Sequence, residues 1–198
     1  MEVKFAIFCL INFTLAGLLQ TRWLKKRYLK GLMRPLDFGI HVFGRPLFGE
    51  NKTIYGFVGM PFFCGASFFA TGIYWKNFIE HEPLLKTHEL VRKLPVLPVE
   101  FFMFGILCGL VYMCGELPNS FLKRQLGIAP GGAPRFRVLK PVFYVFDQLD
   151  SVFCVVVFLC VQYSLGLVFL VTCLASGFFI HGLFNVLLWK LGMKERPI

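Results

Sequence analysis

Residues 151–189 read SVFCVVVFLCVQYSLGLVFLVTCLASGFFIHGLFNVLLW, and no charged side chain interrupts them. A helix that crosses a bilayer needs about 20 predominantly apolar residues, so this stretch is too long for one crossing and long enough for two. The polar run at 162–164 and the nearby Gly166 are the best place for a turn. The stretch therefore predicts a transmembrane hairpin, with helices near 148–164 and 167–190.

The rest of the chain has the composition of an integral membrane protein. Of the 198 residues, 57% are hydrophobic and only 16% are charged. A soluble domain of this size could not cover so much apolar surface with so few charges. Three further runs with few or no charges predict helices near 4–21, 53–75 and 96–115. We therefore expect an all-α, polytopic membrane protein with about five transmembrane helices and a single domain over residues 1–198.

The cations indicate how these helices are oriented, because cytoplasmic segments of membrane proteins are enriched in Lys and Arg. Sixteen of the 21 cations lie at 22–52, at 116–147 or after residue 189, and these segments share one side of a five-helix topology. We expect the N-terminus outside, the C-terminus in the cytoplasm, and a site that faces the cytoplasm from the cell (inner) membrane. Since this location explains the net charge of +10, nucleic acid is not an expected partner.

The second cytoplasmic loop, 116–147, holds the residues that most suggest chemistry. Its cations are Lys123, Arg124, Arg135, Arg137 and Lys140. They precede Asp147 and Asp150, which lie on one face if this segment is helical. Mg²⁺ is usually held by one or two carboxylates together with substrate phosphates, so the pair suggests a metal–phosphate site. Spacing alone leaves open an ordinary acid pair at a helix start beside a basic loop.

The first cytoplasmic loop, 22–52, becomes rich in Gly and Pro before the second helix, and carries Asp37, Asn51 and Lys52 close to Thr53. Glycine lets backbone N–H groups approach phosphate oxygens, and Lys and Thr supply further donors. The register G-x-x-x-x-G-K-[ST] is absent, so the loop is not a Walker A motif. Composition alone gives only a weak indication of a phosphate-binding loop.

Other polar and sulfur-containing side chains have ordinary structural explanations. The segment between the second and third predicted helices contains several His and Glu residues. They fit a solvated external loop better than a metal site; they are Glu80, His81, Glu82, His88 and Glu89. All seven cysteines lie in apolar runs without zinc-site spacing, which indicates small buried side chains. His181 and Asn185 are four residues apart in the last helix, and either bond to neighbouring helices or help to shape a site.

Four segments resemble, in order, the motifs of the CDP-archaeol synthases, small membrane cytidylyltransferases related to the CDP-diacylglycerol synthases. They are GRPLFGENKTIYG (44–56), PNSFLKRQLGI-x-PG (118–131), DQLDSV (147–152) and IHGLFNVLLWKLGMKERP (180–197). The resemblance covers most of residues 37–198. The wider phosphatidate cytidylyltransferase signature also looks similar, and its positions here are Ser120, Lys123, Arg124, Gly131, Gly132, Asp147 and Asp150.

This resemblance implies transfer of CMP from CTP to a phosphorylated lipid, giving a CDP-activated lipid and pyrophosphate, with Mg²⁺ as the cofactor and CTP as the co-substrate. It assigns Asp147 and Asp150 to the metal, with Asp37 as a further metal contact. Lys123 and Arg124 would neutralise the pyrophosphate, and with the two aspartates they form the expected catalytic set. The expected contacts to nucleotide or lipid phosphate are Asn51, Lys52, Thr53, Asn119 and Ser120.

The acceptor is left open among an archaeal ether lipid, phosphatidate and another phosphorylated lipid, because Phe38 departs from the continuation of the archaeal members. The oligomeric state is left open between a monomer and a homodimer. CDP-alcohol phosphotransferases need a D-G-x-x-A-R element, which the sequence lacks. A small transporter or a structural membrane subunit is the non-catalytic alternative, although no internal repeat relates the two halves.

Overall fold

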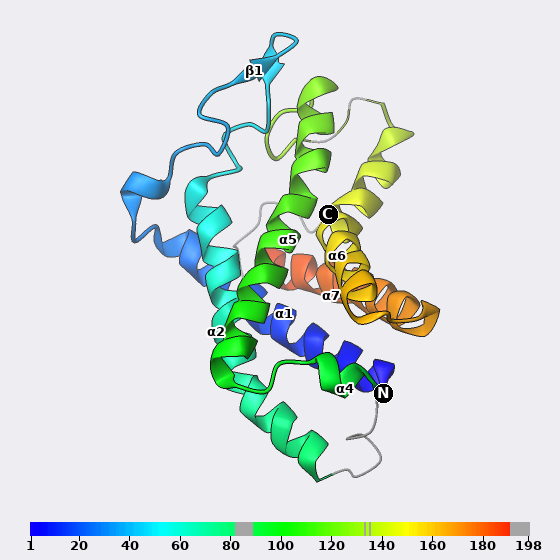
Figure 1. Cartoon of the computed structure of the whole chain (residues 1–198). Helices are drawn as coiled ribbons and strands as arrows, with labels where there is room; N and C mark the ends of the chain where they lie inside the picture. Colours follow the sequence, from blue (N-terminus) through cyan, green and yellow to red (C-terminus); the bar gives the residue numbers. More distant parts are fainter. Residues whose placement is uncertain (82–88, 133, 135, 191–198) are drawn as a thin grey trace.

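The computed structural model describes residues 1–81, 89–132, 134 and 136–190 of the chain. Five long helices make up its body: α1 (Glu2–Lys26), α2 (Ile54–Glu80), α5 (Pro98–Gln125), α6 (Leu139–Tyr163) and α7 (Leu167–Lys190) (Figure 1). All five are long and apolar enough to cross a membrane. The prediction of an all-α membrane protein with five candidate transmembrane helices is therefore confirmed.

The smaller elements lie in the connections between the long helices. A 3₁₀ turn (Lys30–Leu32) and a hairpin of β1 (His41–Val42) and β2 (Arg45–Pro46) precede α2, and the short helix α4 (Glu89–Lys93) precedes α5. The sequence had not predicted this hairpin. Arg45 donates to the backbone carbonyl of Gln125, so the hairpin is attached to the C-terminal end of α5.

Four helices extend beyond the bounds that the uncharged runs had predicted. α1 continues past residue 21 to Lys26, and α2 continues past residue 75 to Glu80. α5 continues past residue 115 to Gln125, and α6 begins at Leu139 rather than near residue 148. Charge limits the part of a helix that lies in hydrocarbon, but backbone hydrogen bonding continues beyond it. The 28 residues of α5 span about 42 Å at 1.5 Å per residue, against a hydrocarbon core of about 30 Å. Much of the expected second loop is therefore helical.

α2 and α5 lie side by side (Figure 1), and glycines on α5 let the two backbones approach. Gly105 and Gly109 have the G-x-x-x-G spacing of close helix pairs in membranes. A Cβ added at Gly105 would lie 2.6 Å from the carbonyl oxygen of Cys64, and one added at Gly109 would lie 2.5 Å from the Cα of Pro61. Neither position has room for a side chain.

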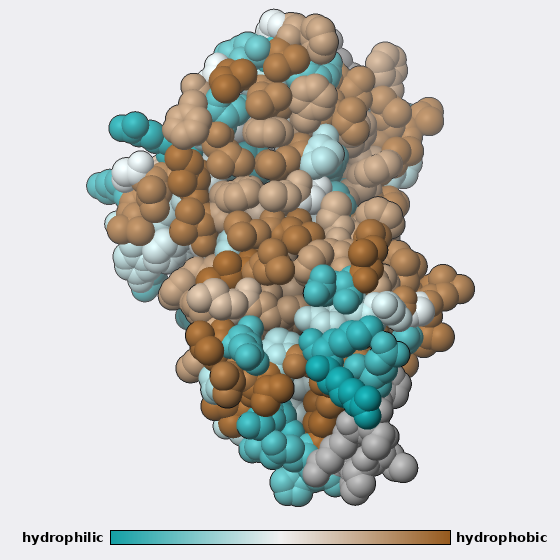
Figure 2. Space-filling model, in the orientation of Figure 1, coloured by the Kyte–Doolittle hydropathy of each residue, from teal (hydrophilic) through white to brown (hydrophobic). Residues whose placement is uncertain are grey.

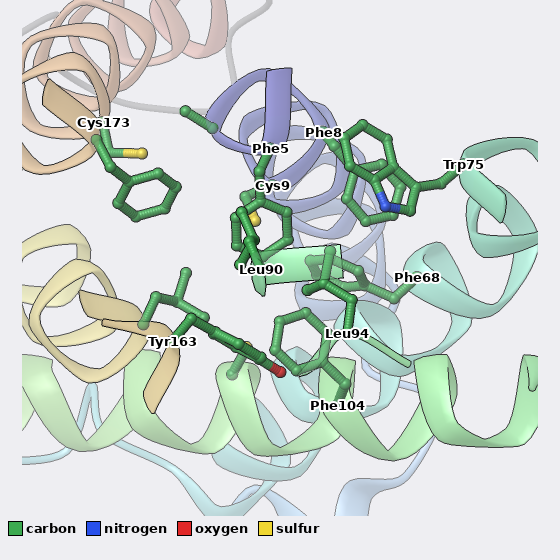
Figure 3. Packing of buried hydrophobic residues seen from close by; sticks show 14 of the residues in the cluster. Phe5, Phe8, Cys9, Phe68, Trp75, Leu90, Leu94, Phe104, Tyr163 and Cys173 are labelled. Carbon is green, nitrogen blue, oxygen red and sulfur yellow. The ribbon is translucent and has the colours of Figure 1, made fainter. Parts of the chain in front are cut away.

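Aromatic rings fill the core that joins α1 to α2, α5, α6 and α7 (Figure 3). The ring of Phe8 stacks on Trp75 at 4.5 Å between centroids, and Phe5 packs edge-on against Tyr163 at 5.8 Å. Such pairs contribute about 0.5–1.5 kcal/mol each beyond the area that they bury. Other phenylalanines, such as Phe62, Phe69 and Phe153, are exposed on the outer surface, and hydrophobic groups spread over the middle of the visible face (Figure 2). This surface suits contact with lipid tails.

The turn between the last two helices lies where the polar run had predicted it. α6 ends at Tyr163, Ser164 adopts a left-handed conformation (φ 55°), and α7 begins at Leu167. Glu2 Oε1 accepts the N–H of Gly166 at 2.8 Å, which joins the start of α1 to this turn.

Candidate functional site

The carboxylates of Asp147 and Asp150 converge on one side chain of a neighbouring helix. Both residues are on α6, and the amide of Asn119 on α5 donates to Asp147 Oδ1 at 2.6 Å and to Asp150 Oδ2 at 2.8 Å. The pair lies well inside α6, which begins at Leu139, so it is not an acid pair at a helix start. The three-residue spacing does place both carboxylates on one face, as the sequence suggested.

Close packing of α5 on α6 makes this convergence geometrically feasible. A Cβ added at Gly115, one turn before Asn119 on α5, would lie 2.9 Å from the Cβ of Cys154 and 3.1 Å from the carbonyl oxygen of Asp150. The absence of a side chain at Gly115 therefore lets the two backbones meet beside the carboxylates.

The oxygen groups at this point fit a magnesium ion. The Oδ1 atom of Asn119 is buried and has no hydrogen-bond partner among the described residues. Its orientation follows from the two carboxylates, because only the NH₂ end of the amide can donate to them. No group of three or more His, Cys, Asp or Glu side chains that could hold a metal occurs in the described part of the chain. An ion there would complete its shell with water and substrate oxygens, as Mg²⁺ usually does.

The two adjacent cations of α5 have different surroundings. Lys123 forms an ion pair with Asp147. Arg124 is only 8% exposed, and its Nη2 donates to the carbonyl of Ala129 at 3.3 Å. The Arg124 side chain also lies against Gly49, where an added Cβ would be 3.1 Å from its Cδ. Lys123 thus pairs with one of the two carboxylates, whereas Arg124 lies against the first loop.

These groups line a polar cavity of about 340 Å³ between the first loop and helices α5, α6 and α7. The structure brings together at this cavity most of the residues that the sequence suggested: Asn51, Lys52, Asn119, Ser120, Lys123, Arg124, Asp147 and Asp150. Thr53 and Asp37 are not in its lining. Thr53 caps α2, accepting the N–H of Gly56 at 3.2 Å, and lines the adjoining cavity described below.

Asp37 shapes the first loop through hydrogen bonds to its backbone. Oδ2 accepts the N–H groups of Phe48 at 2.9 Å and Gly49 at 3.0 Å, and Oδ1 accepts that of Gly39 at 3.0 Å. Burial raises the pKa of the carboxyl, but these donors outweigh it, and the pKa of Asp37 lies below its ordinary value. Gly49 has φ of +87°, a conformation that L side chains rarely adopt. These contacts explain Asp37 without a metal.

Asp37→Asn is expected to lower thermal stability at neutral pH and to remove part of its acid dependence. Because the folded-state pKa lies below that of an unfolded aspartate, the ionised carboxylate stabilises the loop above the unfolded pKa, and this contribution is lost as the pH falls through the folded pKa. Melting temperatures of both proteins in detergent should therefore differ at pH 7 and converge below about pH 4. A constant difference at every pH would contradict this role.

A second cavity of about 390 Å³ adjoins the polar one and is mostly apolar. It lies among α1, α2, α5, α6 and α7, with side chains such as Phe13, Met60 and Val156 in its lining. The two cavities share a set of lining residues: Asn51, Lys52, Glu116, His181 and Asn185. Lys52 forms an ion pair with Glu116. A polar and an apolar cavity therefore meet at this pair.

Glu116 is a charged residue of the lining of both cavities that sequence reasoning missed. Its position with Asn119 and Lys123 follows the three- and four-residue spacing of one helical face. That spacing could have shown that α5 continues beyond residue 115. The expectation that charged residues end a transmembrane helix placed Glu116 in a loop instead.

His181 and Asn185 take up both roles that the sequence left open for them. The hydroxyl of Tyr112 and His181 Nε2 are hydrogen-bonded at 2.9 Å, and Asn185 donates to Gln148 Oε1 at 3.2 Å. Both residues thus bond to neighbouring helices, and both also line the two cavities. Four features of the sequence lie outside the described residues, namely Glu82, His88, Arg135 and the end of the fourth motif at 191–197.

Comparison of the sequence with known proteins finds one family, both in a family model and in a curated relative. The family model described as CarS-like, CDP-archaeol synthase, matches residues 24–198. The CDP-archaeol synthase of Methanospirillum hungatei JF-1 is 26% identical over 176 residues, which cover 85% of this chain and 92% of that protein. No solved structure matches the chain.

Proposed function

The chain belongs to the CDP-archaeol synthase family, which indicates CTP-dependent cytidylyl transfer to a lipid, and we propose that it carries out this reaction with Mg²⁺ on a phosphorylated lipid acceptor. An oxygen of the lipid phosphate would attack the α-phosphorus of CTP, and the bond to the β-phosphate would break to release pyrophosphate. The observation that carries this proposal is the pair of aspartates held together by Asn119 at a polar cavity that adjoins an apolar one.

Asp147, Asp150 and the free Oδ1 of Asn119 are the groups that would hold Mg²⁺. When bound, the ion would neutralise negative charge on the phosphates of CTP and on the leaving pyrophosphate. The amide of Asn119 keeps both carboxylates in place before substrates arrive, which reduces the reorganisation that binding requires. Asp37 does not line this cavity, and we propose that it acts on the site by holding the backbone of the first loop rather than by contacting the metal.

The cations of the polar cavity would bind the phosphates. Lys123 offers a point charge beside Asp147, and Arg124 offers a planar fork beside the first loop. Asn51 and Ser120 line the same cavity and can donate further hydrogen bonds. Phosphoryl-type transfer depends mainly on in-line placement and charge neutralisation, so such donors would suffice without a covalent intermediate.

The apolar cavity is our proposed site for the part of the acceptor next to its phosphate. A membrane-embedded lipid can reach it without leaving an apolar environment, and its phosphate then enters the neighbouring polar cavity. We further propose that this end of the bundle faces the cytoplasm from the cell membrane, where CTP is available. The cations of residues 22–52 support this orientation.

The test is pyrophosphate release by the purified protein in detergent, with CTP, Mg²⁺ and a panel of phosphorylated lipids. The panel includes an ester lipid, dioleoyl phosphatidate, and an ether lipid, diphytanylglyceryl phosphate. Release that depends on one lipid, and that Asp150→Ala abolishes, supports the proposal and identifies the acceptor. A folded protein that neither binds CTP nor releases pyrophosphate would indicate the non-catalytic alternative, a transporter or a structural subunit.

A further inference from the structure

The carboxylate of Glu116 lies where the proposed function would place anionic substrates. Glu116 lines both the polar cavity and the apolar cavity. A negative charge at this place repels a triphosphate and a lipid phosphate alike. Glu116 is also not part of a three-carboxylate metal site, since no such group occurs among the described residues. Its presence therefore requires a different explanation.

The partner of Glu116 is Lys52, and the two side chains are 24% and 23% exposed. The backbone of Lys52 is fixed independently: its carbonyl accepts the N–H of Leu36 at 2.7 Å, and its N–H donates to the carbonyl of Gly49 at 3.1 Å. Gly49 is itself bound to Asp37. The loop thus fixes the main chain of Lys52, and Glu116 fixes the end of its flexible side chain.

Lys52 differs from the other cations of the site in its location. Among the described residues it is the cation shared by both cavities, whereas Lys123 and Arg124 line only the polar one. CTP is polar throughout and needs the polar cavity alone. A phosphorylated lipid has an apolar and an anionic part, so it is the substrate that must cross the junction. An ammonium has three N–H donors, and Glu116 accepts from one, which leaves two for a phosphate.

We propose that Glu116 is a positioning residue that holds the Lys52 ammonium at the junction of the two cavities, where Lys52 binds the phosphate of the lipid acceptor. This inference rests on the proposed function and identifies the acceptor-phosphate subsite within it. It also predicts a preference for phosphorylated over unphosphorylated lipids, because only a phosphate can use the two remaining donors of Lys52 fully.

The test compares four variants, Lys52→Met, Glu116→Gln, Glu116→Asp and Glu50→Gln, by the KM for lipid and the KM for CTP. Glu50→Gln is the matched control, because Glu50 is an exposed acid of the same loop that lines neither cavity. Lys52→Met is expected to raise the KM for lipid by about 10- to 100-fold, as for loss of a charge-assisted hydrogen bond. Glu116→Gln should raise it about three- to fivefold, and Glu116→Asp should restore part of the loss.

A second readout is independent of turnover. Binding of dioleoyl phosphatidate and of diphytanylglyceryl phosphate in detergent micelles is compared with binding of dioleoylglycerol. The native protein should prefer one of the phosphorylated lipids, and Lys52→Met and Glu116→Gln should reduce that preference while CTP binding changes little.

The outcomes separate this inference from the proposed function. An active protein in which Glu116→Gln or Lys52→Met raises the KM for CTP instead of lipid overturns the inference alone. Equal binding of phosphorylated and unphosphorylated lipids by the native protein overturns it as well. A preference for phosphorylated lipid that depends on Lys52, in a protein that releases no pyrophosphate with any lipid, supports the subsite and refutes the proposed reaction.

Discussion

Replacement of Asp147 by asparagine is expected to lower lipid-dependent pyrophosphate release by about a thousandfold or more, because charge stabilisation in such sites commonly contributes this much to the rate. Asparagine keeps the volume of the side chain, and its oxygen can still accept from Asn119. The substitution removes the negative charge that pairs with Lys123 and that would hold Mg²⁺. The loss should therefore reflect the charge and not the fold.

Two further measurements make this prediction specific. Binding of Mn²⁺, a substitute for Mg²⁺, should weaken in Asp147→Asn when it is followed by electron paramagnetic resonance, while the melting temperature in detergent changes little. Asp150→Asn should behave similarly, and the double variant should be hardly less active than either single one, because the two carboxylates act as a unit.

Glu80→Gln is the matched control for these variants, since Glu80 is an exposed acid at the far end of α2 from the site. Its activity should equal that of the native protein. If Asp147→Asn keeps a rate within tenfold of the native rate, the carboxylate of Asp147 is not a metal ligand. This conclusion would hold even if the native protein were shown to bind Mn²⁺.

Replacement of Gly105 by leucine is expected to have the largest effect on folding. A Cβ at this position already meets the carbonyl oxygen of Cys64 at 2.6 Å and the Cα of Gly65 at 2.8 Å, and these are backbone atoms that cannot rotate away. Overpacking typically costs about 1–3 kcal/mol, and the larger side chain of leucine would force α2 and α5 apart. We expect little folded protein in detergent, measured by size-exclusion chromatography and thermal unfolding.

Alanine variants keep this prediction falsifiable if the leucine variant cannot be purified. Gly105→Ala should lower the melting temperature clearly. Gly17→Ala on α1 should not, because an added Cβ at Gly17 meets nothing within 4 Å and alanine favours a helix by about 1 kcal/mol over glycine. Equal melting temperatures for the two variants would mean that close approach of α2 and α5 is not required.

Much of the fold could be predicted from the sequence because its main signal is local. An uncharged stretch such as 151–189 must be helical in a bilayer, since every backbone N–H and carbonyl group there needs a partner within the chain. The helix ends were predicted less well, because hydropathy reports where hydrocarbon ends and not where backbone hydrogen bonding ends. That difference moved residues 116–125 from an expected loop onto α5.

The part of the candidate site that lies within one turn of a helix could be predicted from the sequence. Asp147 and Asp150 share a face by spacing alone, and the structure has them on one face of α6. For Thr53 and Asp37, to which the resemblance assigned phosphate or metal contacts, the structure shows hydrogen bonds that the sequence did not suggest. Their observed partners are backbone N–H groups of Gly56 and of Phe48 and Gly49, a choice that depends on the path of the chain.

The sequence by itself determined the membrane class, the five candidate spanning helices and the carboxylate pair, because composition and helical periodicity act over one or a few turns. Only the tertiary structure decided that Asn119 of α5 joins that pair and that Glu116 meets Lys52 of the first loop. These contacts link residues far apart in the chain. They depend on how closely α5 approaches its neighbours, which glycines such as Gly105 and Gly115 permit by the side chains that they lack.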